Sequence, residues 1–171
     1  TKSPKSKVNM AQGIHTELTF ERAIEESLLE KGGYTKGYSE DFDAQTGLFP
    51  SYIINFLKES QPLLWGKLAN IHKDEVDKKV MQRLIKEIDL RGVLDVIRNG
   101  FTDYGVKFQM AFFKPESTLN PDAEVLYNKN SLSVIRQVYY ERVGKNSLDM
   151  VFALNGLPVA TVELKNQFSG Q

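Results

Sequence analysis

The sequence predicts a mixed α/β (α+β) fold, in which helices come first and a largely antiparallel central sheet follows, flanked by those helices. Two observations predict it. Apolar residues recur at helical spacing through the first half of the chain, and from Gly92 onward short runs rich in Val, Ile, Phe and Tyr alternate with turn residues. That order of elements is typical of helices packed on one mainly antiparallel sheet.

Helices are predicted where apolar residues return every three or four positions between capping or breaking residues. Thr19 is a plausible N-cap for the first helix, and Gly32-Gly33 would end it. Pro50 and Pro62 suit the first turns of two short helices. The predicted helices cover residues 19–31, 50–58, 62–71 and 74–90.

Strands are predicted in the second half, because β-branched and aromatic residues cluster there in short runs. Asn99-Gly100 and Asn155-Gly156 mark turns between the runs. Residues 34–47 and 114–130 are expected to be loops. The predicted strands cover residues 92–97, 104–113, 133–140, 148–154 and 159–164.

For the domain organisation, we expect a mobile basic tail and lead-in over residues 1–18, because the first residues are polar, basic and without periodicity. A single domain is expected over residues 19–171, with a helical segment over about residues 50–91.

Composition excludes several classes of protein. The chain has 171 residues, of which 41% are hydrophobic, so it is long enough to bury a core. It has no cysteine, which excludes disulfides, thiolate catalysis and cysteine-held zinc. The sequence shows neither a membrane-length apolar run nor a secretory signal, so we expect a cytoplasmic protein without membrane contact.

Charge argues against one further class. Lys plus Arg and Asp plus Glu number 22 each, so the net charge is zero. This balance is evidence against a simple electrostatic binder of nucleic acid. It does not exclude a nuclease, because a metal site needs acidic residues and contacts with DNA can lie on other domains.

The last two predicted strands form a hairpin whose alternation places charged residues on one face. Even-numbered residues on both strands are apolar, whereas the odd-numbered ones include Asp149, Glu163 and Lys165. For both apolar sets to share a face, paired residues must both be even or both be odd, which a plain two-residue turn does not give. We therefore expect a three-residue loop with Gly156 as a left-handed bulge, and Asp149 opposite or diagonal to Glu163.

Two carboxylates this close repel each other unless a cation lies between them. Mg²⁺ is usually held by one or two carboxylates together with water and phosphate oxygens, and the backbone carbonyl of Leu164 is a further candidate ligand. Lys165 could orient or help deprotonate an attacking water, or stabilise the developing phosphate charge. Asp149, Glu163 and Lys165 therefore suit phosphodiester hydrolysis. The alternative is a solvated sheet face with a Glu–Lys cross-strand pair.

These residues also resemble a known family. Residues 133–166, SVIRQVYYERVGKNSLDMVFALNGLPVATVELKN, resemble the nuclease region of the restriction and translocation subunit of type I restriction enzymes. Residues 16–34, TELTFERAIEESLLEKGGY, resemble the family's opening helix. The resemblance implies a PD-(D/E)xK nuclease core, in which Asp149 matches the metal-binding aspartate, Glu163 the second carboxylate and Lys165 the catalytic lysine. Leu148 stands where the superfamily's name has proline.

Three further implications concern cofactor and partners. The resemblance implies Mg²⁺ as cofactor, double-stranded DNA as substrate, and modification and specificity subunits as partners. Family subunits continue into an ATP-driven motor, but the sequence has no G-x-x-x-x-G-K-S/T loop, so ATP binding is expected only in motor domains outside this segment. The family's Q-x-x-x-Y element is not found before Gln171.

Supporting roles are assigned by resemblance to residues outside the hairpin. Glu21 resembles an acidic residue that many such nucleases place near the metal, with Glu25 and Glu26 as competitors. A solvated helix face is the favoured interpretation for all three. Arg136 and Gln137 match the family's strand motif, either as contacts to the DNA backbone or as support for the site.

Other residues with reactive or large side chains match no motif. His15, His72 and Trp65 are expected in ordinary packing or at the surface. The leading hypothesis is an endonuclease domain that cuts double-stranded DNA within an ATP-driven type I restriction-modification complex. The alternatives are a stand-alone repair or defence nuclease and a catalytically silent nuclease-like module for assembly or DNA clamping.

Overall fold

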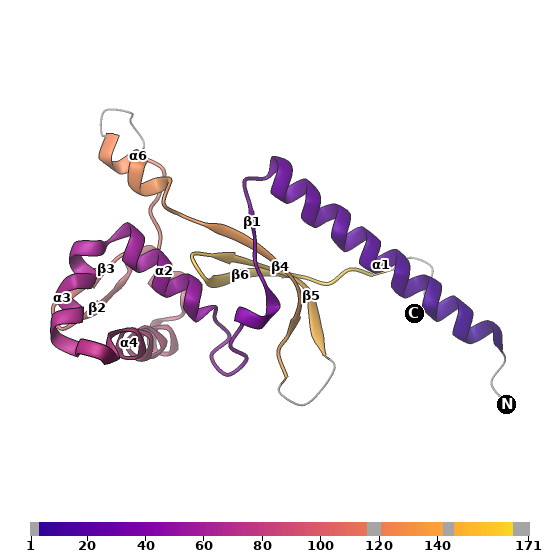
Figure 1. Cartoon of the computed structure of the whole chain (residues 1–171), viewed down its shortest axis with the longest axis horizontal. Helices are drawn as coiled ribbons and strands as arrows, with labels where there is room; N and C mark the ends of the chain where they lie inside the picture. The colour runs from indigo at the N-terminus through magenta and orange to yellow at the C-terminus, as the bar shows by residue number, and fades with distance from the viewer. Residues whose placement is uncertain (1–3, 116–120, 142–145, 166–171) are drawn as a thin grey trace.

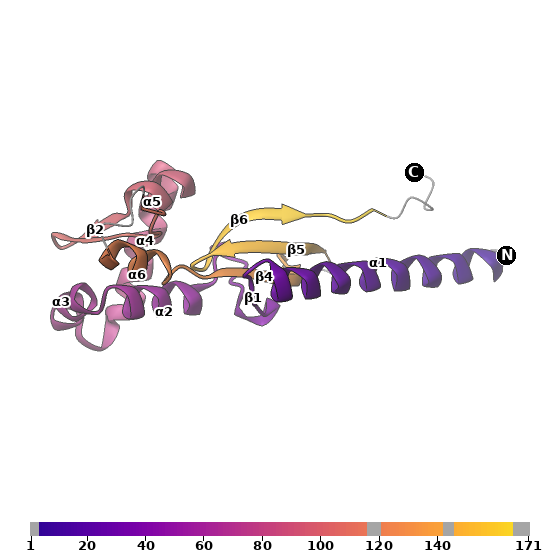
Figure 2. The ribbon, with the colours of Figure 1, turned by 90° about the horizontal axis from the view of Figure 1, so that it is seen from above.

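The computed structural model describes residues 4–115, 121–141 and 146–165, with side chains from Glu17 onward. Its fold is mixed α/β, as the sequence predicted. A sheet lies in the middle of the molecule, α1 (Pro4–Lys31) runs beside it, and a helical lobe lies at its other end (Figures 1 and 2). In both views the N-terminal half of α1 extends away from the rest of the chain.

The central sheet has the strand order β1-β4-β5-β6. Its strands are β1 (Thr35–Lys36), β4 (Leu132–Tyr139), β5 (Ser147–Leu154) and β6 (Leu157–Val162). The pairs β4–β5 and β5–β6 are antiparallel, whereas the short β1 is parallel to β4. The sheet is therefore mixed and largely antiparallel, which confirms the predicted class.

The helical lobe lies between β1 and β4 in the sequence. Pro50 and Pro62 occupy the first turns of its first two helices, where a missing N–H costs nothing. Its elements are α2 (Pro50–Ser60), α3 (Pro62–His72), η2 (Lys73–Glu75), α4 (Val76–Arg91), α5 (Val93–Asn99), β2 (Phe101–Asp103) and β3 (Val106–Phe108). The predicted helices at 50–58, 62–71 and 74–90 are thus confirmed, with ends shifted by one or two residues.

Two cores support these parts. The larger core fills the lobe and includes fully buried side chains from α2, α3, α4, α5 and β3. The second lies on one face of the sheet, where Phe49 packs with Ile135 of β4 and Val151 and Ala153 of β5. Leu157, the first residue of β6, belongs to the lobe's core. The hairpin and the lobe therefore share buried apolar surface.

Some predicted elements were wrong. The expected strand at 92–97 is instead helix α5 (Val93–Asn99), because an apolar run this short does not distinguish a helix from a strand. Arg91 stabilises this helix: it pairs with Asp95 and donates a hydrogen bond to the carbonyl of Gly100 (2.7 Å). The expected strand at 104–113 is instead the second half of a short hairpin that turns at Tyr104-Gly105.

The ends of two other elements also differ from expectation. Helix α1 begins at Pro4 rather than at Thr19, so residues 4–18, expected as tail and lead-in, are helical. Once a docked segment has nucleated a helix, each added residue costs little, and no apolar stripe is needed. The expected loop at 114–130 contains α6 (Pro121–Tyr127).

Among the described helices, including the long α1, none is apolar enough over a sufficient length to cross a membrane.

Gly156 permits the close approach of the β5–β6 turn to the lobe. Its φ is 88°, and an added Cβ would lie 2.7 Å from the backbone nitrogen of Ile53 and 2.8 Å from the carbonyl oxygen of Phe49. The backbone nitrogen of Phe49 donates to the Gly156 carbonyl at 3.1 Å. No side chain fits between these backbones, and the left-handed conformation also favours glycine.

We predict that Gly156→Ala lowers the free energy of unfolding by about 1–3 kcal/mol through overpacking against immovable backbone. Denaturant unfolding of the purified protein measures this change. The matched control is Gly66→Ala, at an exposed position of α3 where an added Cβ meets nothing within 4 Å. That variant should gain about 0.5–1 kcal/mol. Equal stability of Gly156→Ala and wild type would show that the lobe does not hold the turn.

Candidate functional site

The candidate site lies at the open end of the β5–β6 hairpin, and its geometry depends on the turn at the other end. The turn has two residues, Asn155 (φ 52°) and Gly156 (φ 88°), between the paired Leu154 and Leu157. The expected three-residue loop was therefore wrong, since two left-handed residues complete the turn themselves.

A β-bulge restores the register that the sequence required. The register shifts beside Phe152 and Ala153: Ala153 pairs with Pro158, but Phe152 pairs with Ala160. The extra residue is Val159. Beyond the bulge, pairs join residues of equal parity, such as Met150 with Val162. Continuing that register by one residue places Asp149 opposite Glu163.

Asp149 is directed toward the segment that carries the other two candidates. Its Oδ2 accepts a hydrogen bond from the backbone nitrogen of Leu164 at 2.6 Å. Asp149 is half-buried, whereas Glu163 and Lys165 are exposed. The structure therefore brings the aspartate to the backbone between Glu163 and Lys165. Among the described residues, none covers the side chains of Glu163 and Lys165, which lie open to solvent.

Side chains near Asp149 are buried on both faces of β5, not only on the even-numbered face that was expected to be apolar. Val151 and Ala153, on the odd-numbered face, are buried, but Val159 is 45% exposed because it lies in the bulge. Met150, on the even-numbered face, is fully buried. Both faces of β5 are therefore covered beyond Asp149, and the strand is held firmly behind the candidate carboxylate.

A second polar group links α1 to the sheet. Glu21 and Glu25 are only 2% and 5% exposed, so the predicted solvated helix face was wrong for both, while Glu26 is exposed as expected. The Arg136 guanidinium donates to Glu21 and Glu25, each at 3.3 Å. The Lys36 ammonium lies 4.0 Å from Glu25. Buried carboxylates need such partners, so the cluster fixes α1 on β4.

Gln137 belongs to the same cluster. Its Nε2 donates to Glu21 at 2.9 Å, and its Oε1 accepts a hydrogen bond from the Ser147 hydroxyl at 3.2 Å. Arg136 and Gln137 thus face the first helix. The link between Gln137 and Ser147 was missed by the sequence reasoning, since nothing in strand alternation predicts the left-handed φ of 51° at Gln137.

Asn155 has a role that the turn motif alone did not reveal. It is 1% exposed, and its side chain donates to the carbonyl of Met110 (2.9 Å) and accepts from the backbone nitrogen of Ser131 (2.7 Å). It thus joins the turn to the lobe and to the chain that enters β4. Its occurrence in an Asn-Gly pair predicted the turn but gave no sign of these partners.

The histidine and tryptophan expected in ordinary packing are found there. His72 Nε2 lies 2.8 Å from Asp103 Oδ2, and both side chains are nearly buried. Trp65 is buried in the lobe's core, with the Lys58 ammonium 5.0 Å from its ring centroid. The side chain of His15 lies outside the described residues. These groups are remote in sequence from the hairpin and join lobe elements to one another.

The donor atoms beside Asp149 suit a hard divalent cation. Within the described ranges, no three Asp, Glu or His side chains gather at one point. The candidate set is instead two carboxylates, Asp149 and Glu163, with the Leu164 backbone carbonyl. An all-oxygen set with one or two carboxylates is what Mg²⁺ prefers, because it keeps several waters. The residues present therefore fit the ion.

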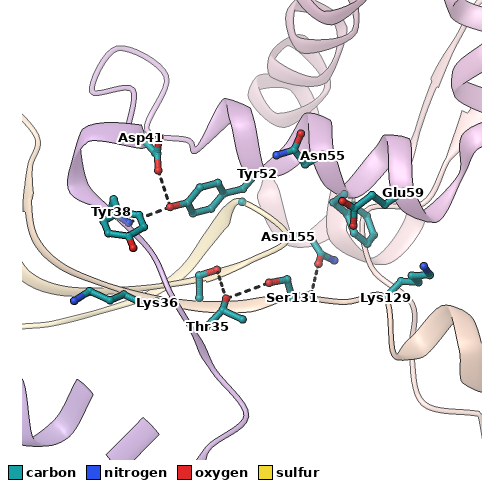
Figure 3. Close-up of a pocket in the computed structure, with 13 residues that line it drawn as sticks. Thr35, Lys36, Tyr38, Asp41, Tyr52, Asn55, Glu59, Lys129, Ser131 and Asn155 are labelled. Carbon is teal, nitrogen blue, oxygen red and sulfur yellow. Dashed lines mark hydrogen bonds between the residues drawn. The ribbon is translucent and has the colours of Figure 1, made fainter. Parts of the chain in front are cut away.

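A separate pocket of about 360 Å³ lies between α2 and the β1–β4 edge of the sheet (Figure 3). Its lining includes hydroxyl groups on one side and Tyr52 and Asn55 on the other. Thr35 Oγ1 lies 3.1 Å from Ser133 Oγ and 3.3 Å from Ser131 Oγ. None of the predicted site residues lines this pocket.

Tyr52 closes one side of this pocket. Its hydroxyl donates to Asp41 at 2.8 Å and accepts from the backbone nitrogen of Tyr38 at 3.0 Å (Figure 3). Burial, and secondarily the Asp41 carboxylate, raise the pKa of Tyr52 from its ordinary value of 10.0 to about 12, while the Tyr38 N–H opposes the shift. The phenol thereby ties η1 (Ser39–Asp41) to α2 in its protonated form.

We predict that this tie is lost in alkali. A raised folded-state pKa means that the stabilisation is complete below pH 10 and disappears as the pH rises toward about 12. The melting temperature of wild type should therefore fall more steeply over this range than that of Tyr52→Phe. Tyr139→Phe, at a 52% exposed residue, is the matched control and should follow wild type. Parallel curves for wild type and Tyr52→Phe would contradict the assignment.

Comparison with known proteins gives one match. Residues 15–171 match the model of the family described as "Type I restriction enzyme R protein N terminus". Neither the curated proteins nor the solved structures contain a match to the chain. The match spans α1 from residue 15 onward, the lobe and the whole hairpin, and so includes both segments whose resemblance was noted in the sequence. The chain therefore belongs to the family of N-terminal regions of type I restriction enzyme R proteins.

Proposed function

We propose that this domain is a Mg²⁺-dependent endonuclease that hydrolyses DNA phosphodiester bonds, with Asp149, Glu163 and Lys165 as its catalytic residues. The observation that carries the proposal is the hydrogen bond from the Leu164 backbone to Asp149, which joins the aspartate to the E-L-K segment. Family membership supports the same reaction, since R proteins belong to restriction enzymes. A solvated Glu–Lys pair would not require an aspartate aimed at its backbone.

The two carboxylates have separate geometric roles. Asp149 is oriented by one oxygen, Oδ2, which accepts the Leu164 N–H, and the described structure gives its Oδ1 no hydrogen-bond partner. That oxygen, together with Glu163 and the Leu164 carbonyl, would hold the ion. When bound, Mg²⁺ would lower the pKa of an attacking water and neutralise phosphate charge. Asp149 is fixed before the ion arrives, which reduces the entropic cost of binding.

Lys165 supplies the positive charge that belongs to the protein itself. It is exposed and two residues beyond Glu163, so in an extended chain it projects to the same side. Its ammonium can donate to a phosphate oxygen or to the attacking water, and it stabilises negative charge as that charge develops. A neutral domain gains local affinity for phosphate in this way without a large basic surface.

Family membership also supports a proposal for the wider setting of the domain. We propose that the domain acts in the cytoplasm within an ATP-driven type I restriction-modification complex. Double-stranded DNA would be its substrate, and the modification and specificity subunits its partners. ATP would bind motor domains outside this segment. The zero net charge supports this arrangement, because a domain held on DNA by partners needs little electrostatic affinity of its own.

We predict that Asp149→Asn abolishes saturable Mn²⁺ binding and Mg²⁺-dependent cleavage in the full-length protein. The amide oxygen of asparagine still accepts the Leu164 N–H, so the substitution removes charge and leaves the local backbone intact. Calorimetric titration measures binding, and plasmid cleavage with Mg²⁺ and ATP measures activity. Asp89→Ala, at an exposed carboxylate of α4, is the control. Unchanged Mn²⁺ affinity in Asp149→Asn would favour the silent clamping module instead.

Lys165→Ala tests the chemical step separately from the metal. We predict that cleavage falls by roughly 10²–10³-fold, the usual cost of removing one group that stabilises transition-state charge, while Mn²⁺ affinity stays within about twofold of wild type. Lys107→Ala, at an exposed lysine of β3, controls for the loss of one positive charge. Wild-type cutting by Lys165→Ala would remove the lysine from the mechanism.

A further inference from the structure

A non-glycine residue in the left-handed conformation interrupts β4 at the level of Asp149. The pairs Arg136–Met150 and Val138–Leu148 belong to the β4–β5 ladder, and between them the ladder skips Gln137 and Asp149. Gln137 has a φ of 51°. For a residue with a Cβ this conformation is unfavourable and persists only where surrounding contacts impose it.

The contacts that impose it come from the Gln137 side chain. Its amide is held at both ends, by Glu21 on α1 and by Ser147 on β5. Glu21 is almost fully buried and is itself fixed by Arg136. The amide therefore links α1, β4 and β5 through hydrogen bonds, and we call this link the Gln137 bridge. Its partner on β5, Ser147, lies two residues before Asp149.

The interruption has a consequence for Asp149. A residue paired regularly in a ladder has its backbone direction set by the neighbouring strand. Asp149 faces Gln137 at the skipped position. Its orientation is therefore set by the Gln137 bridge and by its hydrogen bond to the Leu164 nitrogen at 2.6 Å. We propose that Gln137 is a positioning residue that orients Asp149 toward the segment of Glu163 and Lys165. This inference deepens the proposed function and rests on it for the metal and cleavage readouts.

The same geometry argues against Gln137 as a contact to the DNA backbone. Both polar ends of its amide are engaged within the protein, and the residue is half-buried. A group that positions a metal ligand changes metal affinity and the chemical step, whereas a group that binds substrate changes KM. The two roles are therefore separable by kinetics.

Two substitutions of Gln137 in the full-length protein separate the effect of the Gln137 bridge from the effect of the left-handed backbone conformation. Gln137→Ala removes the amide and keeps a Cβ at the left-handed position, while Gln137→Gly removes the amide and relieves the strain. In both variants we expect faster hydrogen exchange at the Leu164 amide, with exchange elsewhere in the β5–β6 ladder unchanged. Mn²⁺ affinity should fall by about 10- to 100-fold, and kcat should fall while KM for DNA stays unchanged.

The controls isolate each component of the change. Tyr104→Gly relieves the same kind of strain at a residue that is 73% exposed in the lobe, and Gln82→Ala removes an exposed amide from α4. Both should match wild type in Leu164 exchange, Mn²⁺ affinity and kcat.

Three results would overturn the proposal. The first is wild-type protection of the Leu164 amide from hydrogen exchange in Gln137→Ala. The second is a Gln137→Gly variant with the Leu164 exchange, Mn²⁺ affinity and kcat of wild type. The third is a raised KM for DNA with kcat unchanged in either variant. The Leu164 exchange readout needs neither metal nor DNA. If wild-type protein binds no Mn²⁺, the nuclease proposal fails, while exchange at Leu164 still decides whether Gln137 orients Asp149.

Discussion

The candidate site depends on the register of the β5–β6 hairpin, and two local features set that register. The two-residue turn at Asn155-Gly156 pairs residues of opposite parity, and the bulge at Val159 changes the pairing to equal parity. A shift of one residue in a strand moves every side chain to the other face. Without the bulge, Asp149 and Glu163 would lie on opposite sides of the sheet. The proposed site at the open end of the hairpin therefore depends on a bulge near its turn.

Each end of the hairpin is held by a different part of the chain. At the turn, Asn155 and Gly156 bond to the lobe, and Leu157 enters the lobe's core. The helical segment over about residues 50–91 thus has a structural role, because the turn packs against it. Toward the open end, the buried carboxylates of α1 bind Arg136 and Gln137. The strand that carries Asp149 is consequently fixed between two bodies, a condition that precise ligand placement requires.

The sequence predicted most of this where local patterns carry the information. Proline and apolar periodicity located α2, α3 and α4, and alternation located β4 and β5 within a residue. The alternation of apolar residues predicted the equal-parity pairing but not the turn, because a bulge and a longer loop have the same effect on register. The burial of Glu21 could not be predicted, since it depends on Arg136, a partner far away in the sequence. The helix at residues 93–99 could not be predicted because so short an apolar run does not distinguish a helix from a strand.

The charges themselves distinguish the structural carboxylates from the candidate metal ligands. Glu21 and Glu25 are buried, and each has a cationic partner in Arg136 or Lys36, so their charges are neutralised within the protein. Asp149 has only a neutral backbone donor, and the register places it opposite Glu163. In the part of the chain that the structure describes, no ion pair reaches either of them. Two like charges on adjacent strands repel, which favours a cation from outside the fold between them, as the proposed metal site requires.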